Sequence, residues 1–484
     1  GAAVLAASGA DYGIAGEGEC AAVELFGAIA AGKAPPRGTV VSSPADVILG
    51  ARYSRKIADW YDRETHNIPI QTKRGCPFRC SYCLSSTDVS VRFKSLEKVK
   101  DELNFFLKNK VRLVKFVDRT YNLNEERYIA IWQYIIENWN GITTFHFEIE
   151  AQQLTDKALE CIKNVKPNCM QFEIGIQTTN EPTLKEIQRP FDSNKIKYVL
   201  ENIPESIHVH LDLIAGLPYE TLSEFENSFN YTIKLNPRML QLGFLKILHG
   251  TQMESFAEKN PGYKWLSCAP YEVLCSPWMT FSELQMLKHI DLLVDNIYNS
   301  QNFLQTLRYI STLNINQFAF YTQLESYLAE KHFFDTLHKP EIFFDILFDF
   351  FSEYNEYIKM MNIESDEVLF CEDNVLIIKE LLKFDYIRRA KTSTFPSWYK
   401  RNYSKENHRA VLENNYDISS TRDSYINSAY EEFSVNPFTF EMSPAKVLFI
   451  YNTQKLNGAA AKTFLKEENT ECILIEESML SSGN

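Results

Sequence analysis

Between residues 66 and 250, short runs of β-branched and aromatic residues alternate with longer stretches of helical apolar spacing. The runs that read as strands are Ile68–Lys73, Leu113–Val117, Thr143–Ile149, Met170–Ile176, His208–Ile214 and Met239–Lys246. The helical stretches between them are Leu96–Lys108, Glu125–Trp139, Asp156–Val165, Glu181–Ile187 with Lys195–Asn202, and Thr221–Lys234. Strands that alternate with helices predict a parallel α/β sheet with right-handed crossovers, here an open or partial barrel of six strands.

This regular region divides the 484 residues into four parts. Residues 1–34 read as a strand and a helix, and residues 35–65 as a linker rich in Pro, Ser and Gly. Residues 66–280 form the predicted barrel. Residues 281–484 have mainly helical spacing and end in two further strand-like runs, KVLFIYNTQ and ECILIEE. We therefore expect a barrel followed by a mainly α-helical C-terminal domain.

A cluster of cysteines follows the first strand, in the segment RGCPFRCSYCLSS. Cys76, Cys80 and Cys83 form a C-x3-C-x2-C array. Iron–sulfur clusters are held by thiolates, commonly four, so three thiolates would leave one iron of a [4Fe–4S] cluster open. An open coordination position is typical of a catalytic centre. A zinc site is the alternative, with His66 as the nearest further ligand.

Polar side chains stand near the ends of the predicted strands. They include Glu148 and Glu150, then Glu173 and Gln177, and then Asp212. The active site of a parallel α/β barrel lies at the carboxyl ends of its strands, which meet at one edge of the sheet. Polar residues inside strands are costly to bury unless they are paired or functional, so mutual pairing inside the barrel is the alternative to a site.

With Tyr82 directly before its third cysteine, the array resembles the motif of the radical S-adenosylmethionine (SAM) superfamily. The resemblance implies a partial TIM-like (β/α)6 barrel, a [4Fe–4S] cluster on Cys76, Cys80 and Cys83, and SAM bound at the open iron. In that superfamily an electron from the cluster cleaves SAM to a 5′-deoxyadenosyl radical, which abstracts a hydrogen atom. The chain is thus expected to be an enzyme, namely an oxidoreductase, a methyltransferase or a related type.

The resemblance also implies which side chains contact SAM. They are Tyr82, Asp118, Glu150, Gln177, Arg189 and Asp212. Arg189 and Gln177 would bind the carboxylate side of SAM, whereas Glu150 and Asp212 would bind its amino or ribose groups. The family's Gly-Gly-Glu at the end of the second strand is replaced here by VDRTYN, in which Asp118 would be the substitute.

The N-terminal segment DYGIAGEGE, followed by a helix, resembles the end of a cobalamin-binding domain. Gly16, Glu17, Gly18 and Glu19 carry this likeness, and an ordinary glycine-rich turn is the alternative. Because only one strand and one helix are present and the chain begins with Gly, we expect a truncated Rossmann-like remnant and assign cobalamin to a full-length parent. The C-terminal part resembles the domain of unknown function found in one subgroup of such proteins.

Charge bears on the partners of this chain. With 50 basic and 63 acidic side chains the net charge is −13, which disfavours nucleic acid as a partner. A basic and aromatic segment from Lys383 to Arg401 leaves an RNA-modifying radical SAM enzyme as a second hypothesis, and a non-catalytic iron–sulfur or zinc module is the third. We expect a small-molecule or peptide substrate and a reductant such as flavodoxin or ferredoxin. A cytoplasmic location and no membrane span are also expected.

Overall fold

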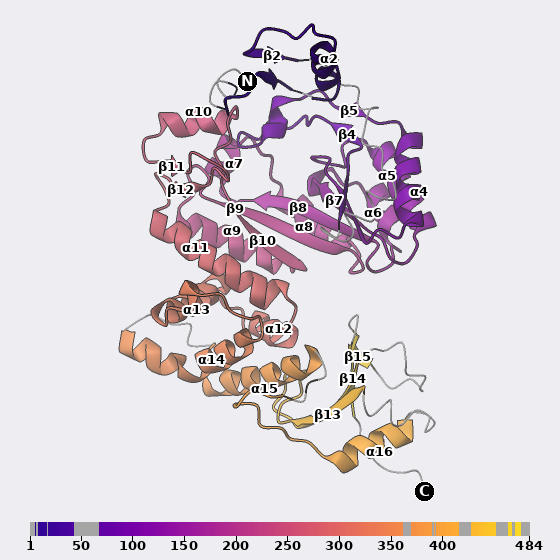
Figure 1. Ribbon diagram of the computed structural model, residues 1–484. Helices are drawn as coiled ribbons and strands as arrows, with labels where there is room; N and C mark the ends of the chain where they lie inside the picture. The colour runs from indigo at the N-terminus through magenta and orange to yellow at the C-terminus, as the bar shows by residue number, and fades with distance from the viewer. Residues whose placement is uncertain are drawn as a thin grey trace. The chain divides into compact units, whose positions relative to one another are not determined.

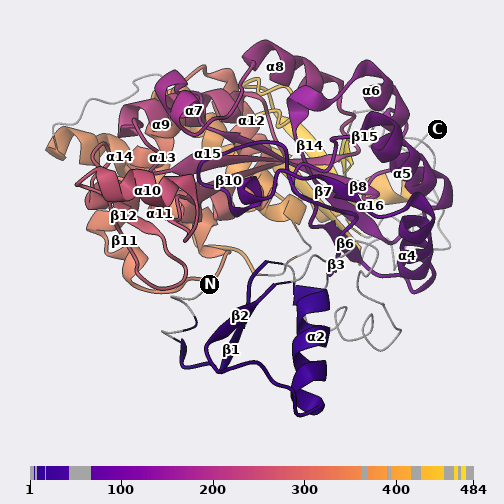
Figure 2. The same ribbon diagram turned by 90° about the horizontal axis from the view of Figure 1, so that it is seen from above.

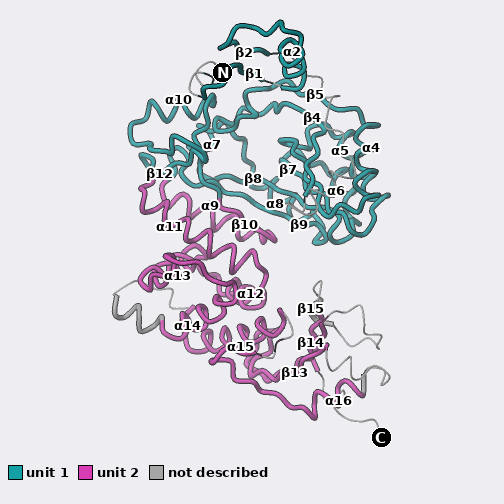
Figure 3. The backbone as a smooth tube through the Cα atoms, viewed as in Figure 1, with its two compact units in different colours: residues 1–220, 243–278 teal, residues 221–242, 279–484 magenta. Residues whose placement is uncertain are grey.

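The computed structural model describes residues 5, 8–16, 18–42, 67–361, 369–389, 392, 394–415, 427–451, 463–466 and 470–475. The chain divides into two compact units (Figure 3). The first contains residues 1–220 and 243–278, and the second contains residues 221–242 and 279–484.

A six-stranded sheet organises the barrel region. Its strands, in order across the sheet, are β10 (Met239–Phe244), β9 (His208–Ala215), β8 (Met170–Gln177), β7 (Thr144–Ile149), β6 (Leu113–Phe116) and β3 (Ile68–Ile70). The pairs from β3 to β9 are parallel. The strands of this sheet follow one another in space in the same order as in the sequence, so the chain winds in one direction, as in a barrel. This confirms the predicted partial (β/α)6 architecture.

Helices connect the strands and match the predicted helical stretches. They are α4 (Leu96–Lys108), α5 (Glu125–Asn138), α6 (Asp156–Ile162), α7 (Glu181–Glu186), α8 (Ser193–Asn202) and α9 (Leu222–Lys234). Four of them begin after a side chain that accepts a hydrogen bond from an otherwise unpaired backbone amide of the first turn. These capping residues are Ser95, Asn124, Thr155 and Asp192.

The core of the first unit lies between the sheet and helices α4, α5 and α6, which flank it (Figures 1 and 2). Phe145, Phe147 and Phe172 alternate along β7 and β8 and are fully buried. Trp132 of α5 stacks on Phe172 with ring centroids 5.2 Å apart. Burying one such side chain contributes about 1.5–3 kcal/mol. The apolar face of the sheet is therefore committed to the core, which leaves the opposite face to polar side chains.

The N-terminal segment forms β1 (Tyr12–Ile14), α2 (Gly18–Ala30) and β2 (Thr39–Val41), which Figure 2 shows together. β1 and α2 are the predicted strand and helix. β2, which lies within the predicted linker of residues 35–65, pairs in parallel with β1. The β-branched sequence Thr39-Val40-Val41 is the local reason for a strand there. Residues 43–66, the rest of that linker and its end at His66, lie outside the described residues.

The second unit continues with helices and ends in a sheet. Its helices from residue 281 on are α11 (Phe281–Leu293), α12 (Leu304–Thr312), α13 (Gln317–Glu330), α14 (Ile342–Met361), α15 (Glu372–Arg389) and α16 (Lys405–Asn415). The antiparallel sheet has the order β13 (Ser428–Phe433), β14 (Ala445–Tyr451), β16 (Thr470–Leu474) and β15 (Thr463–Lys466). β14 and β16 are the two predicted strands, whereas β13 and β15 were not predicted. Among the described residues, no helix has the length and apolarity that crossing a membrane requires.

Candidate active site

The three cysteines lie in the loop between β4 (Lys73–Arg74) and β5 (Arg92–Phe93), which pair in antiparallel fashion and close its base. The Cys76 amide donates to the Asp88 carbonyl over 2.9 Å. Gly75 enters the loop with φ +81°, and a Cβ there would lie 2.1 Å from the Ser90 carbonyl oxygen. Only glycine fits this position, which shapes the start of the loop.

The loop is also held from two helices. The Ser81 amide donates to the Ile187 carbonyl, at the end of α7, over 3.1 Å. The Ser81 carbonyl accepts from the Met253 amide over 2.9 Å, at the start of α10 (Gln252–Lys259). Backbone contacts on both sides therefore fix the loop without using the cysteine side chains.

The thiols of this loop form an all-sulfur donor set. Cys76 and Cys80 are buried and Cys83 is partly exposed. Burial raises the pKa of the Cys80 thiol, the Arg189 guanidinium opposes this rise, and Cys83 and Cys76 are close enough to add to it. Within the described residues, no three His, Cys, Asp or Glu side chains are already gathered as a metal site. Three thiols on one short loop nevertheless suit an iron–sulfur cluster by ligand type.

Arg189, at the loop after α7, joins the cysteine loop to the sheet. Its Nη2 donates to the Glu150 carboxylate over 2.8 Å and to the Gly175 carbonyl over 2.6 Å. Burial alone would lower the pKa of Arg189, but the Glu150 carboxylate raises it above its ordinary value. Burial raises the pKa of Tyr82, and Arg189 opposes that rise. The structure thus brings Tyr82, Glu150 and Arg189 together beside Cys80.

Gln177 and Asp212 complete this group with two buried polar atoms that have no partner. At the end of β8 a register shift between Gly175 and Gln177 accompanies a positive φ of 68° at Gln177. Among the described residues, Gln177 Oε1 and Asp212 Oδ1 are buried without a hydrogen bond. Burial raises the pKa of Asp212 to about 8, and the nearby Glu173 carboxylate adds to the rise. An unsatisfied buried polar atom costs about 1–3 kcal/mol, so these atoms indicate where a ligand would bind.

The structure places Asp118 elsewhere. Its carboxylate accepts hydrogen bonds from the Thr72 amide over 2.7 Å, from the Lys73 amide over 3.1 Å, and from the Thr72 hydroxyl. Asp118 is 1% exposed, and burial raises its pKa while Thr72 opposes the rise. The side chain therefore anchors the turn from β3 to β4 and is not grouped with the other candidate SAM contacts.

A row of paired polar side chains crosses the same face of the sheet. Glu173 was named among the candidates near strand ends, and its contacts follow the alternative of mutual pairing, whereas Lys115 and His146 were not named. His146 Nε2 lies 2.8 Å from the Glu173 carboxylate, and Lys115 Nζ lies 3.3 Å from it. Burial would raise the pKa of Glu173, but the His146 hydrogen bond and Lys115 lower it to about 2. In the neighbouring register position, burial lowers the pKa of His210 to about 4. These residues come from four neighbouring strands, β6 to β9, so the register between the strands brings them together, which no spacing within one strand shows.

Of the predicted cobalamin residues, Gly16 follows β1, and Gly18 and Glu19 are the first two residues of α2. Gly16 has φ +76°, and an added Cβ at Gly16 or Gly18 would meet no atom within 4 Å. Glu19 forms an ion pair with Arg74 of β4, and Glu17 lies outside the described residues. The sequence has no histidine before His66 that could offer cobalt an imidazole. The segment provides open space but no cobalt ligand of that kind, so we derive no step through cobalamin.

Comparisons with known proteins agree with this geometry. Residues 70–232 match the Radical SAM superfamily, and residues 259–457 match a protein of unknown function, DUF4080. An uncharacterized methyltransferase, PH0819, of Pyrococcus horikoshii is 25% identical over 195 residues, which are 40% of this chain and 42% of that protein. A tRNA-2-methylthio-N(6)-dimethylallyladenosine synthase of Clostridium botulinum is 21% identical over 226 residues, 43% of this chain and 50% of that protein.

Among solved structures, the radical SAM methyltransferase TsrM from Kitasatospora setae, with tryptophan substrate and a SAM analog bound, aligns with a TM-score of 0.39 and 15% identity. The alignment covers 44% of each chain. The chain spans about half the length, or less, of the curated relatives it matches. The two family matches show that the chain carries a radical SAM domain, of the superfamily that uses a [4Fe–4S] cluster and SAM, followed by a DUF4080 region.

Proposed function

We propose that this chain is a radical SAM enzyme whose cluster is held by Cys76, Cys80 and Cys83. The observation that carries the proposal is the position of the cysteine loop. It lies at the carboxyl edge of a parallel sheet, beside buried polar atoms that lack partners. When bound, the cluster supplies the electron that cleaves SAM to a 5′-deoxyadenosyl radical.

The residues around the loop have separate tasks in this proposal. Arg189 is oriented by Glu150 and by the Gly175 carbonyl, both through Nη2, and a guanidinium has further donors for the SAM carboxylate. Within the described residues, Asp212 Oδ1 is buried without a partner and suits the amino or ribose groups of SAM, as the resemblance implies. The partnerless atom of Gln177 is its acceptor Oε1, which suits the same groups, so we propose this role for Gln177 in place of the carboxylate contact that the resemblance implies. Tyr82 is half-buried near Cys80, Cys83 and Arg189, where its ring would cover part of the cluster site.

The test is anaerobic reconstitution with iron and sulfide, followed by reduction and measurement of 5′-deoxyadenosine. We expect Cys80→Ala to abolish SAM cleavage. Cys268→Ala is the matched control, because Cys268 is exposed and lies outside the array, and it should leave cleavage unchanged. Reconstituted protein that binds the cluster but never cleaves SAM would support the non-catalytic iron–sulfur module instead.

The second hypothesis, RNA modification, finds little support in the basic segment. Arg388 is 2% exposed and lies 3.2 Å from the Asp385 carboxylate. Arg401 Nε lies 3.2 Å from the buried Glu431, and Arg389 pairs with Glu341 over 3.2 Å. Cations that are neutralised by internal carboxylates contribute little to phosphate binding. Mobility shifts with transfer RNA at low salt would test this, and we expect none.

We further propose a flavodoxin- or ferredoxin-type reductant, a small-molecule or peptide substrate, and a reducing, cytoplasmic environment. None of the ten cysteines, all of which lie in the described ranges, forms a disulfide. Product analysis with the identified substrate would separate an oxidoreductase from a methyltransferase.

A further inference from the structure

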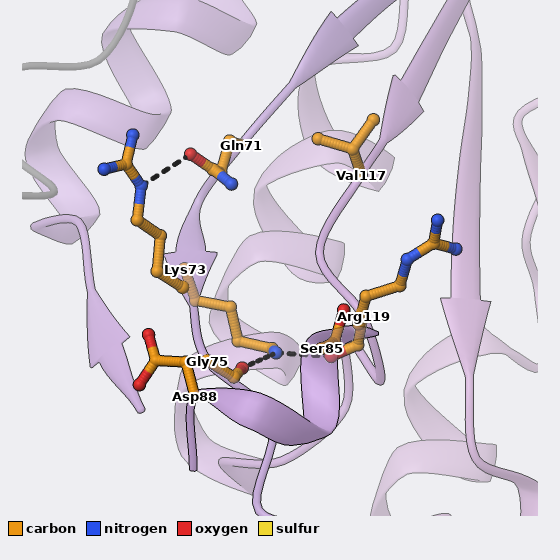
Figure 4. Close-up of a pocket in the computed structure, with 8 residues that line it drawn as sticks. Gln71, Lys73, Gly75, Ser85, Asp88, Val117 and Arg119 are labelled. Atoms are coloured by element: carbon orange, nitrogen blue, oxygen red, sulfur yellow. Dashed lines mark hydrogen bonds between the residues drawn. The ribbon is translucent and has the colours of Figure 1, made fainter. Parts of the chain in front are cut away.

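A cavity of about 260 Å³ opens beside the cysteine loop (Figure 4), and neither Arg189 nor the side chains grouped with it line this cavity. The β3–β4 segment, the cysteine loop and the end of β6 line it. Pockets that hold a whole drug-sized ligand measure about 300–1,000 Å³, so this cavity has room for a carboxylate or phosphate group but is small for a whole cofactor.

The cavity is basic in an acidic protein. Its lining contains Lys73, Arg74 and Arg119, against Asp88 as the single carboxylate among the lining residues. The formal charge of the lining is therefore 3 − 1 = +2, whereas the whole chain carries −13. Arg74 and Arg119 are ion-paired with Glu19 and Glu148, neither of which lines the cavity.

Of the three lining cations, Lys73 differs from Arg74 and Arg119 in having no ion pair within the described residues, although the Asp118 and Glu148 carboxylates favour its charge from nearby. It is 2% exposed, and its ammonium donates to the Gly75 carbonyl over 3.1 Å and to the Arg119 carbonyl, as Figure 4 shows. In the described part of the chain its ammonium forms no ion pair, and burial lowers its pKa. Asp118 lies nearby, but its oxygens accept from Thr72 and from the Lys73 backbone.

A lysine ammonium has three donors, and two of them are used here by carbonyl oxygens. Burying a charge is costly unless an opposite charge accompanies it. An anion in the cavity would supply that charge at Lys73, with the two arginines at the rim as further donors. Arg119 is 57% exposed at its side chain and can reorient toward such a group.

We propose that this cavity binds an anionic group of the substrate, a carboxylate or a phosphate, next to the loop that carries the three cysteines. The assignment to substrate rests on the proposed radical SAM function, whereas the binding of the anion can be measured independently of it. The consequence for substrate class is direct: the molecule acted on is an acid or a phosphorylated compound rather than an uncharged one.

The experiment uses the full chain, reconstituted with iron and sulfide, and isothermal titration with inorganic phosphate and with succinate at constant ionic strength. We expect one of the two probes to bind, and the better probe identifies the anion class. Arg119→Gln and Arg74→Gln should each raise its Kd at least tenfold, which is about 1.4 kcal/mol. Arg37→Gln is the matched control, since Arg37 is exposed, pairs with Asp11 and does not line the cavity.

Three results would overturn the inference: neither probe binds, the Arg119 and Arg74 variants bind as tightly as the control, or saturating S-adenosylhomocysteine displaces the probe. The last result would make the cavity part of the SAM site. Formation of 5′-deoxyadenosine is measured in parallel. SAM cleavage without anion binding refutes this inference alone, whereas anion binding without SAM cleavage refutes the proposed function and its assignment to substrate.

Discussion

Replacement of Gly175 by alanine tests whether Gln177 is a SAM contact. A Cβ at residue 175 would lie 1.9 Å from Gln177 Nε2 and 3.4 Å from Arg189 Nη2. The Gln177 amide folds back over the glycine, so alanine must displace it, whereas Arg189 remains at an ordinary contact distance. The φ of Gly175 is not positive, so its backbone accepts alanine without strain.

The size of the effect follows from the contact that is lost. A hydrogen bond to a charged group contributes about 1.5–3 kcal/mol. If Gln177 makes one such bond to SAM, Gly175→Ala should weaken SAM binding roughly 10- to 100-fold. Stability should not fall in parallel, because glycine in a strand is about 0.5–1 kcal/mol worse than alanine.

The assay is equilibrium binding of SAM to reconstituted protein, with the rate of 5′-deoxyadenosine formation against SAM concentration as a second readout. Gly27→Ala in α2 is the control, because a Cβ there meets nothing within 4 Å. Gln177→Ala should weaken binding to a similar extent, and the double variant should lose little more, since both act on one contact. Unchanged SAM affinity in Gly175→Ala, or full additivity in the double variant, would refute the assignment.

Two further predictions concern buried carboxylates. Burial raises the Asp212 pKa from 3.8 to about 8, so between these pH values the folded protein holds a proton that the unfolded chain releases. The protonated carboxyl stabilises the folded state, and this stabilisation is complete below pH 3.8 and lost as the pH rises through about 8. The free energy of unfolding of Asp212→Asn, relative to that of the wild type, should therefore rise between pH 6 and pH 8, by up to about 1.4 kcal/mol per pH unit. Urea unfolding of the cluster-free protein measures this difference. A difference that is equal at both pH values would contradict the prediction. In the second unit, Asp385 is fully buried and accepts from the Thr306 amide and hydroxyl, each over 2.9 Å, and from Arg388. Asp385→Ala should destabilise α12 by about 3–5 kcal/mol, seen as faster amide hydrogen exchange, whereas the exposed Glu413→Ala should cost at most about 1 kcal/mol.

The barrel could be predicted from the sequence because its signals are local. Each strand is a short β-branched or aromatic run, and each of four helices has a capping side chain directly before it. β13 gave no such signal, since its sequence SAYEEF contains two glutamates. Glu431 is 2% exposed in that strand, and its carboxylate accepts from Arg401 and from the Asn402 amide. A distant arginine makes the buried glutamate tolerable, and no local pattern shows such a partner.

The candidate site was predictable as residue types at strand ends, but not as a set of partners. Glu150 and Gln177 were named from their positions at strand ends, and Arg189 from the resemblance to the radical SAM superfamily. The structure shows in addition that Glu150 pairs with Arg189. Gly75 is required because the Ser90 backbone carbonyl lies against it, and Gly175 because the Gln177 side chain folds back over it. Such close approaches have no pattern in the sequence beyond the glycine itself.

The end of β6 shows why a departure from the family motif matters. Where the family has Gly-Gly-Glu, Asp118 is buried and committed to Thr72 and Lys73, so it is not available to the SAM amino group. The partnerless atoms lie instead on β8 and β9, at Gln177 and Asp212. The space beside Asp118 is the basic cavity, which repels an ammonium group and favours an anion. The two sequence neighbours of Asp118, Val117 and Arg119, line the cavity that we propose for an anionic substrate group. Replacing Arg119 should therefore affect anion binding more than SAM binding.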